Sequence, residues 1–168
     1  MTAAPLDLSD RALREGLATC LAVPRWVDEV AAGAPYASLD DLLDAAGLAA
    51  TPLSAEEVDQ ALADHPRIGE RSTGDDTASE FSAAEQEVSA SDDAELAEQL
   101  AAGNRAYEEK FGRIFLIRAA GRSRLEILDE LHRRLEIEPA AEIKVVAAEL
   151  RDIAVRRIAQ LFGSKAAQ

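Results

Sequence analysis

Two charged side chains, Arg157 and Glu85, fall on the apolar faces of helices that the sequence predicts. Successive residues of an α-helix rotate by about 100°, so a residue and the seventh after it share one face. Arg157 follows Leu150 by seven residues, in the middle of an apolar stripe near the C-terminus. Glu85 lies between Phe81 and Val88 by the same arithmetic. A buried unpaired charge is costly, so an inward arginine indicates an anionic partner or ligand.

A histidine and an asparagine fall on apolar faces in the same way. His65 follows Val58 by seven residues, and Asn104 lies close to Leu100 on the inner face of its helix. Asn104 equally fits a core hydrogen-bonding residue, whereas imidazole titrates near neutral pH and is suited to acid–base catalysis. An acid, a base and an arginine on core-facing sides predict a polar pocket. That pattern is as compatible with a buried polar network as with an enzyme site.

These candidate residues also have purely structural interpretations. Ser82 and Glu85 fit the capping-box pattern, in which the glutamate reaches back to the N–H of the serine. His65 fits a histidine at a helix end, and Arg157 fits one half of an internal ion pair. Cys20 fits a small core residue, because the sequence places no base beside it to make a nucleophile.

Capping signals and apolar spacing predict helices throughout the chain. Ser9 is expected to cap the first helix, and Pro24 to open a short second one. Four Ser-x-x-acid boxes are expected to begin further helices: Ser38–Asp41, Ser54–Glu57, Ser82–Glu85 and Ser123–Glu126. The helix after Ser54 is expected to stop at residues 64–66, because the residue before a proline disfavours helical geometry.

Two segments are expected to lie between helices. Residues 66–81 are polar, contain two glycines and show no periodicity, which predicts a surface loop. Residues 115–120 form a short apolar run, which we expect to be an extended, buried connector. A helix from Asp92 or Asp93 to Gly112 precedes this run, and another over roughly 140–162 follows later. The sequence therefore predicts one all-α globular domain, residues 1–168, with about eight helices.

Composition supports this fold class and excludes several functions. The chain has 168 residues, a net charge of −14, 48 % hydrophobic residues and 4 % aromatic residues, which favours an aliphatic, helical core. Such an acidic chain would repel nucleic-acid phosphates. We find no apolar run long enough for a membrane span, no signal peptide, and a single cysteine. A soluble, cytoplasmic protein that binds neither nucleic acid nor membranes is expected.

Other catalytic chemistries lack their motifs. The chain contains no HExxH, no CxxC and no phosphate-binding glycine loop of the GxGxxG or GxxxxGK[ST] type. Nicotinamide, flavin and ATP are therefore not expected, and a metal-dependent hydrolase is only a distant alternative.

Taken in chain order, the motifs resemble those of a known family. The matching stretches are HPRIG (65–69), SAAEQ (82–86), NxxY (104–107), FGRIF (111–115), FLIRAAGR (115–122) and ExxxIxxxRI (149–158). With these, residues 8–162 resemble the decarboxylases of 2-oxo-4-hydroxy-4-carboxy-5-ureidoimidazoline (OHCU), which act in urate breakdown. The resemblance implies an all-α fold, a carboxy-lyase without cofactor or metal, and a small anionic ureido-imidazoline as substrate.

The resemblance also implies site residues and a product. Its catalytic positions fall on His65, Glu85 and Arg157, which the helical arithmetic had already selected. Its substrate-binding positions fall on Pro66, Ser82, Ala83, Ala84, Glu85, Gln86, Phe115, Leu116, Ile117, Arg118 and Ala119. The implied reaction is decarboxylation of OHCU to (S)-allantoin by a monomer or homodimer. The competing interpretation is a non-catalytic helical interaction module with a buried polar network.

Overall fold

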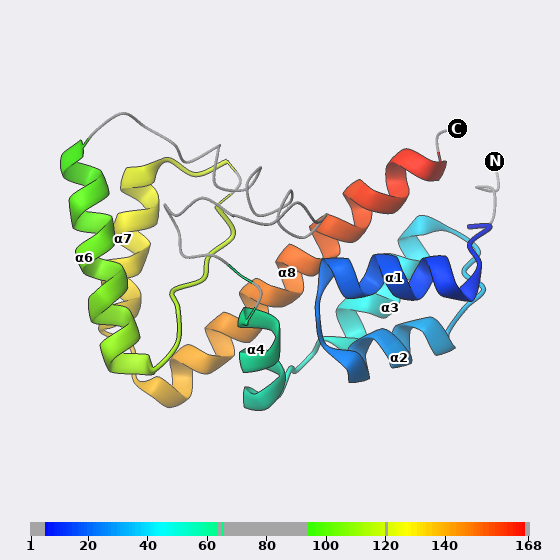
Figure 1. The fold of residues 1–168 in the computed structure, drawn as a ribbon, viewed down its shortest axis with the longest axis horizontal. Helices are drawn as coiled ribbons and strands as arrows, with labels where there is room; N and C mark the ends of the chain where they lie inside the picture. The colour runs from blue at the N-terminus through cyan, green and yellow to red at the C-terminus, as the bar shows by residue number, and fades with distance from the viewer. Residues whose placement is uncertain (1–5, 64, 66–93, 120, 167–168) are drawn as a thin grey trace. The chain divides into compact units, whose positions relative to one another are not determined.

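The computed structural model of the chain describes residues 6–63, 65, 94–119 and 121–166 (Figure 1). In this part of the chain all regular structure is helical, with seven helices and no strand, so the predicted all-α class is confirmed. The predicted loop at 66–81 and the predicted helix after Ser82 lie outside the described residues. No helix in the described ranges has the length and apolar character that crossing a membrane requires.

The chain divides into two compact units. Unit 1 comprises residues 1–61 and 150–168, and unit 2 comprises residues 62–149. The last helix, α8 (Pro139–Ala166), supplies residues to both units. The single domain expected from the sequence remains a prediction.

Three short helices form the first part of unit 1, and each begins where the sequence predicts. They are α1 (Asp10–Cys20), α2 (Pro24–Ala32) and α3 (Leu39–Ala49). The side chains of Ser9 and Ser38 accept hydrogen bonds from the backbone of the first turns of α1 and α3, and Pro24 is the first residue of α2. Trp26 of α2 is fully buried and donates its indole N–H to the carbonyl of Ala46 in α3, at 2.9 Å.

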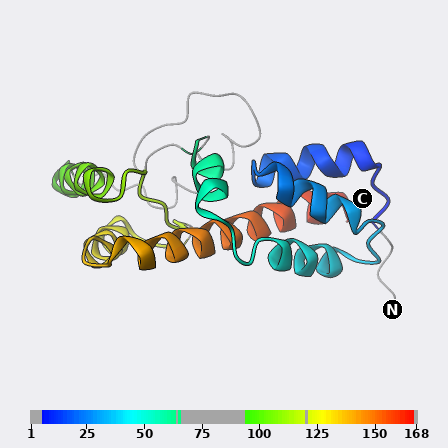
Figure 2. The same ribbon diagram turned by 90° about the horizontal axis from the view of Figure 1, so that it is seen from below.

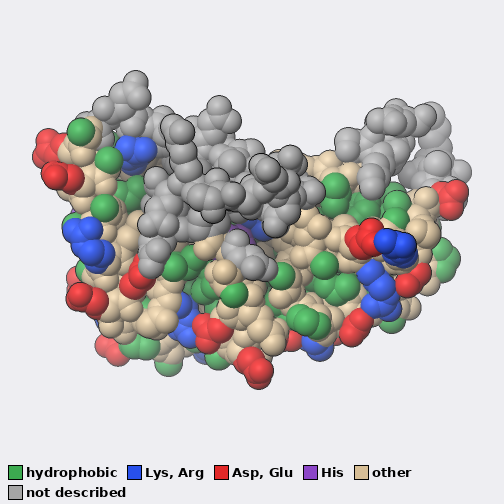
Figure 3. All heavy atoms as spheres, viewed as in Figure 1, with side chains coloured by type: hydrophobic (Ala, Val, Ile, Leu, Met, Phe, Trp, Pro, Cys, Tyr) green, Lys and Arg blue, Asp and Glu red, His purple; other side chains and the backbone are tan. Residues whose placement is uncertain are grey.

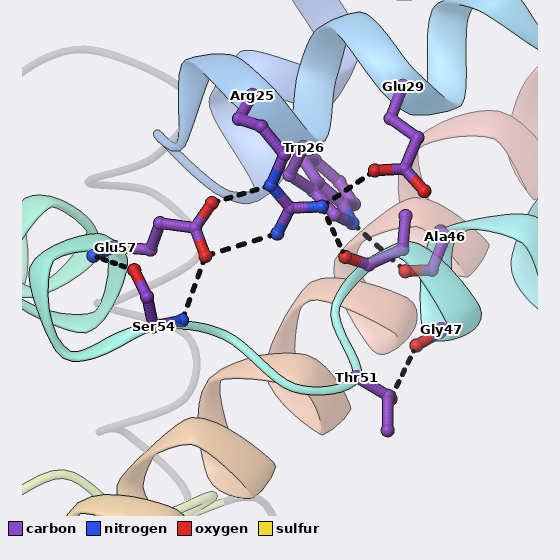
Figure 4. A network of polar contacts seen from close by, with 9 residues as sticks. Arg25, Trp26, Glu29, Ala46, Gly47, Thr51, Ser54 and Glu57 are labelled. Atoms are coloured by element: carbon purple, nitrogen blue, oxygen red, sulfur yellow. Dashed lines mark hydrogen bonds and ion pairs between the residues drawn. The ribbon is translucent and has the colours of Figure 1, made fainter.

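An arginine of α2 joins α3 to the helix that follows it, α4 (Ala55–Leu62) (Figure 4). The guanidinium of Arg25 donates to both carboxylate oxygens of Glu57, at 2.6 and 3.1 Å, and to the carbonyl of Ala49, at 2.8 Å. Glu57 also accepts the N–H of Ser54 at 2.9 Å, which confirms the predicted capping box. The hydrogen bond from Arg25 lowers the pKa of Glu57 below its usual value.

Unit 2 is built on α6 (Ala94–Phe111) and α7 (Arg124–Leu135), which pack side by side and run in the same direction (Figures 1 and 2). A Cβ built on Gly103 of α6 would lie 2.5 Å from Leu131 of α7, so the glycine permits the close approach of the two helices. Ser123 and Glu126 form the predicted capping box at the start of α7.

Parallel neighbouring helices need a connection that returns along their length, and residues 112–119 provide it. Gly112 ends α6 with a φ of 70°, a conformation that glycine adopts without strain. Residues 114–119 have no regular structure. Phe115, Leu116, Ile117 and Ala119 are buried, and all but Leu116 belong to the same apolar cluster as residues of α6 and α7. The predicted buried connector is confirmed over residues 115–119, and residue 120 lies outside the described residues.

Candidate active site

Arg157 lies on the inner side of α8 in unit 1, as the helical arithmetic predicts. Its residue exposure is 3 %, whereas the adjacent Arg156 is exposed. One Nη atom of Arg157 donates to the carbonyl of Cys20 at 3.4 Å. This contact places a permanently charged guanidinium against the C-terminal end of α1.

Cys20 is buried, as its interpretation as a core residue requires. Burial raises the pKa of its thiol to about 12, and the nearby charge of Arg157 opposes that shift only partly. Because the thiolate is the nucleophilic form, a thiol with this pKa is inert at neutral pH. Cys20 therefore contributes packing rather than covalent chemistry.

His65 lies in unit 2, beyond the end of α4, and one step of its derivation from the sequence is wrong. The spacing from Val58 assumes that the helix continues through His65, but α4 ends at Leu62. The N–H of His65 instead donates to the carbonyl of Leu62 at 3.1 Å in a turn. The physical reason is Pro66, which disfavours helical geometry at the preceding residue. His65 is half-buried in this position.

The segment Phe115–Ala119 is held to unit 2 at two backbone atoms. The carbonyl of Leu116 accepts a hydrogen bond from Arg134 of α7 at 2.6 Å, and the N–H of Arg118 donates to Glu149 of α8 at 2.8 Å. Among the described residues, nothing accepts a hydrogen bond from the N–H groups of Leu116, Ile117 or Ala119. Buried backbone N–H groups are nearly always paired, so these donors suit a ligand.

Behind this segment lies a buried ionic network that the sequence reasoning missed. Arg134 and Glu142 are both fully buried, and the guanidinium donates to Oε1 of Glu142 through Nε at 2.7 Å and through a second nitrogen. The hydroxyl of Tyr107 donates to the same oxygen at 2.5 Å. Burial, and then this hydrogen bond, raise the pKa of Tyr107. The guanidinium also lies 4.9 Å from the ring centroid of Phe115.

The sequence did carry a signal for this network. Arg134 follows Ile127 by seven residues, and Glu142 precedes Val146 by four, so both lie on apolar stripes. The same arithmetic that selected Arg157 therefore selects them. Asn104, also placed inward by its spacing, is indeed buried in α6.

The expected site residues that the structure describes belong to both units. His65 and the segment Phe115–Ala119 belong to unit 2, and Arg157 belongs to unit 1. Pro66 and the stretch from Ser82 to Gln86, which includes Glu85, lie outside the described residues. Their assembly into one site remains a prediction.

Comparisons with known proteins agree on one family. The family model for OHCU decarboxylase matches residues 7–159. The chain is 30% identical over 142 residues to the 2-oxo-4-hydroxy-4-carboxy-5-ureidoimidazoline decarboxylase of Haloferax volcanii, covering 83% of each chain. It is 29% identical over 150 residues to the uric acid degradation bifunctional protein TTL of Arabidopsis thaliana, covering 88% of this chain and 46% of that protein. The chain thus spans about half the length of the plant protein.

Two solved structures share the fold. The crystal structure of OHCU decarboxylase in the presence of (S)-allantoin matches with a TM-score of 0.76 and 25% sequence identity, over 93% of this chain and 99% of that one. The crystal structure of (S)-allantoin synthase matches with a TM-score of 0.65 and 17% identity, over 92% of this chain and 51% of that one. The described residues are all helical, and the family match extends over most of the chain, residues 7–159. The chain belongs to the OHCU decarboxylase family.

Proposed function

We propose that this protein decarboxylates OHCU to (S)-allantoin in urate breakdown, without a cofactor. The observation that carries the proposal is the family match across residues 7–159. The likeness to a decarboxylase structure obtained in the presence of (S)-allantoin supports it independently, because that likeness extends over 93% of this chain.

The chemistry of OHCU makes a cofactor unnecessary. One ring carbon carries both a hydroxyl and a carboxylate, and the neighbouring ring carbon is part of a C=N bond. When the bond to the carboxylate breaks and CO2 leaves, its electron pair forms a C=C bond and the C=N nitrogen takes up a proton. The hydroxyl then loses its proton and the neighbouring carbon gains one, which yields allantoin. The substrate therefore contains the electron sink that pyridoxal phosphate or thiamine supplies in other decarboxylases.

Three side chains are proposed to carry out the tasks that remain for the protein. His65 transfers a proton, because imidazole titrates near neutral pH and its half-buried position allows access to a ligand. Arg157 binds oxygen atoms of the anionic substrate through its charged fork. Glu85 orients His65 or accepts a hydrogen bond from the hydroxyl or ureido groups of the substrate.

Backbone and polar groups are proposed to complete the substrate site. The backbone of the segment Phe115–Ala119 binds the amide-like edges of the ring, through N–H groups other than that of Arg118, which donates to Glu149. Ser82 and Gln86 add polar contacts. Pro66, Ala83 and Ala84 line the same site. Delivery of the last proton to one face of the ring carbon then gives one enantiomer of allantoin. We also propose that the protein is cytoplasmic and acts as a monomer or homodimer.

Circular dichroism tests this proposal, because (S)-allantoin is chiral and the spontaneous decay of OHCU gives a racemate. OHCU is generated in situ from urate, and the signal is followed with and without the protein. Build-up of the (S) enantiomer, faster than the background decay, is expected. Racemic product at the background rate would instead support a non-catalytic helical module. Loss of activity with a chelator would favour the metal-dependent alternative.

A further inference from the structure

The backbone of the segment Phe115–Ala119 is hydrogen-bonded to the buried ionic network of Arg134 and Glu142, not to the backbone of a neighbouring helix. The carbonyl of Leu116 accepts from Arg134 at 2.6 Å, and this arginine is fully buried. An irregular backbone has no ladder of its own hydrogen bonds to fix its peptide planes. The direction of each plane must therefore be set by such contacts.

Peptide geometry links this carbonyl to a donor on the opposite side. The peptide bond between Leu116 and Ile117 is trans, so its C=O and N–H point in opposite directions in one plane. Arg134 fixes the carbonyl of Leu116, and the N–H of Ile117 consequently points away from the arginine. Among the described residues this N–H has no acceptor, and Ile117 is buried.

The arginine is itself held in a fixed orientation. Two of its nitrogens donate to Oε1 of Glu142, and the third nitrogen reaches Leu116. Tyr107 donates to the same carboxylate oxygen at 2.5 Å. The rings of Phe115 and Tyr107 lie 4.9 and 5.8 Å from the guanidinium carbon. A planar fork is required for this arrangement, because a lysine ammonium cannot reach the carboxylate and the carbonyl with the same geometry.

We propose that Arg134, held by Glu142, is a positioning residue that aims the N–H of Ile117 at the substrate. This inference rests on the proposed function and deepens it, because it assigns a task to a network outside the predicted catalytic residues. Arg134 acts through the backbone and touches no reacting atom.

The substitution Arg134→Lys tests the proposal. It keeps the buried positive charge but removes the planar guanidinium, which contacts Glu142 and the carbonyl of Leu116 at the same time. A misdirected donor weakens a hydrogen bond to an anionic ligand, so KM for OHCU should rise roughly ten-fold, while kcat stays within about three-fold of the parent value. In the parent, the amide resonance of Ile117 should shift on addition of (S)-allantoin, and Arg134→Lys should require a higher allantoin concentration for the same shift.

Arg25→Lys is the matched control. Arg25 also donates to a carboxylate and to a backbone carbonyl, but it does so in unit 1 and far along the chain from residues 115–119. A loss of stability without a change in KM is expected for it. If folded Arg134→Lys has the KM of the parent, the proposal is wrong.

A second variant decides the question if Arg134→Lys does not fold. Glu142→Asp keeps both charges but draws the carboxylate back by one methylene, and with it the guanidinium, away from Leu116. A several-fold rise in KM supports the proposal, and an unchanged KM overturns it. An inactive parent protein would instead contradict the proposed function itself, so the two failures are distinguishable.

Discussion

Two buried arginines, Arg134 and Arg157, have different surroundings and are assigned different tasks. Arg134 is neutralised by the carboxylate of Glu142, which makes a buried charge tolerable. Arg157 donates to the carbonyl of Cys20 at 3.4 Å, and it is the arginine proposed to bind the anionic substrate. The first arginine therefore suits a structural and positioning task, and the second is assigned to the substrate by the proposed function.

The substitution Arg157→Lys is expected to lower kcat/KM for OHCU by roughly 10- to 100-fold, because a point charge replaces a bidentate fork on the substrate. Arg156→Lys is the matched control, since Arg156 is the exposed neighbour in the same helix, and it should behave like the parent. Steady-state kinetics on both variants give the comparison. Equal kcat/KM values for the two variants would remove Arg157 from the substrate site.

At the scale of the elements, the approach of α6 to α7 depends on the missing side chain of Gly103. Alanine is the better helix former by about 1 kcal/mol, but its Cβ at this position would lie 2.5 Å from the buried Leu131. Overpacking of this kind costs typically 1–3 kcal/mol. Gly103→Ala should therefore lower the free energy of unfolding despite its higher helix propensity.

Gly47→Ala provides the opposite expectation in α3. The nearest atom to a Cβ at Gly47 is 4.0 Å away, so only the propensity gain of about 0.5–1 kcal/mol applies. Urea denaturation of both variants measures whether each substitution lowers or raises the free energy of unfolding. A stabilised Gly103→Ala would show that α6 and α7 have room to separate without loss.

Helix starts were predictable from the sequence, whereas contacts between elements were not. Ser9, Ser38, Ser54 and Ser123 act as caps through residues at most three positions away, so the signal is local. Arg134 of α7 pairs with Glu142 of α8. The spacing of residues within one helix does not predict which residue of another helix they contact. The arithmetic for His65 failed because it extended the helix to a residue directly before a proline, where helical geometry is disfavoured, whereas α4 ends at Leu62.

At the scale of the whole molecule, the net charge of −14 does not draw in an anionic substrate. Acidic and basic side chains lie interspersed on the described part of the face in Figure 3, and exposed pairs such as Arg11–Glu15 contribute little to stability. Attraction of the substrate must therefore come from cations at the site, and the acidic surface serves solubility.

Stability is expected to fall in alkaline solution. Burial raises the pKa of Cys20 from 9.0 to about 12 and also raises the pKa of Tyr107. The unfolded chain therefore loses these protons at lower pH than the folded chain, and the free energy of unfolding decreases as the pH rises from about 9 towards 12. Urea midpoints between pH 8 and 11 should fall more steeply for the parent than for Cys20→Ala. Parallel slopes would show that Cys20 does not contribute.

The most direct test of the central claim combines product stereochemistry with the substitution His65→Ala. OHCU generated from urate is allowed to decay with the parent protein or with the variant, and circular dichroism follows the allantoin formed. The parent should give the (S) enantiomer well above the background rate. The variant, shown to be folded by its far-ultraviolet spectrum, should give racemic product at the background rate. Stereoselective decarboxylation at a near-normal rate by His65→Ala would contradict this account.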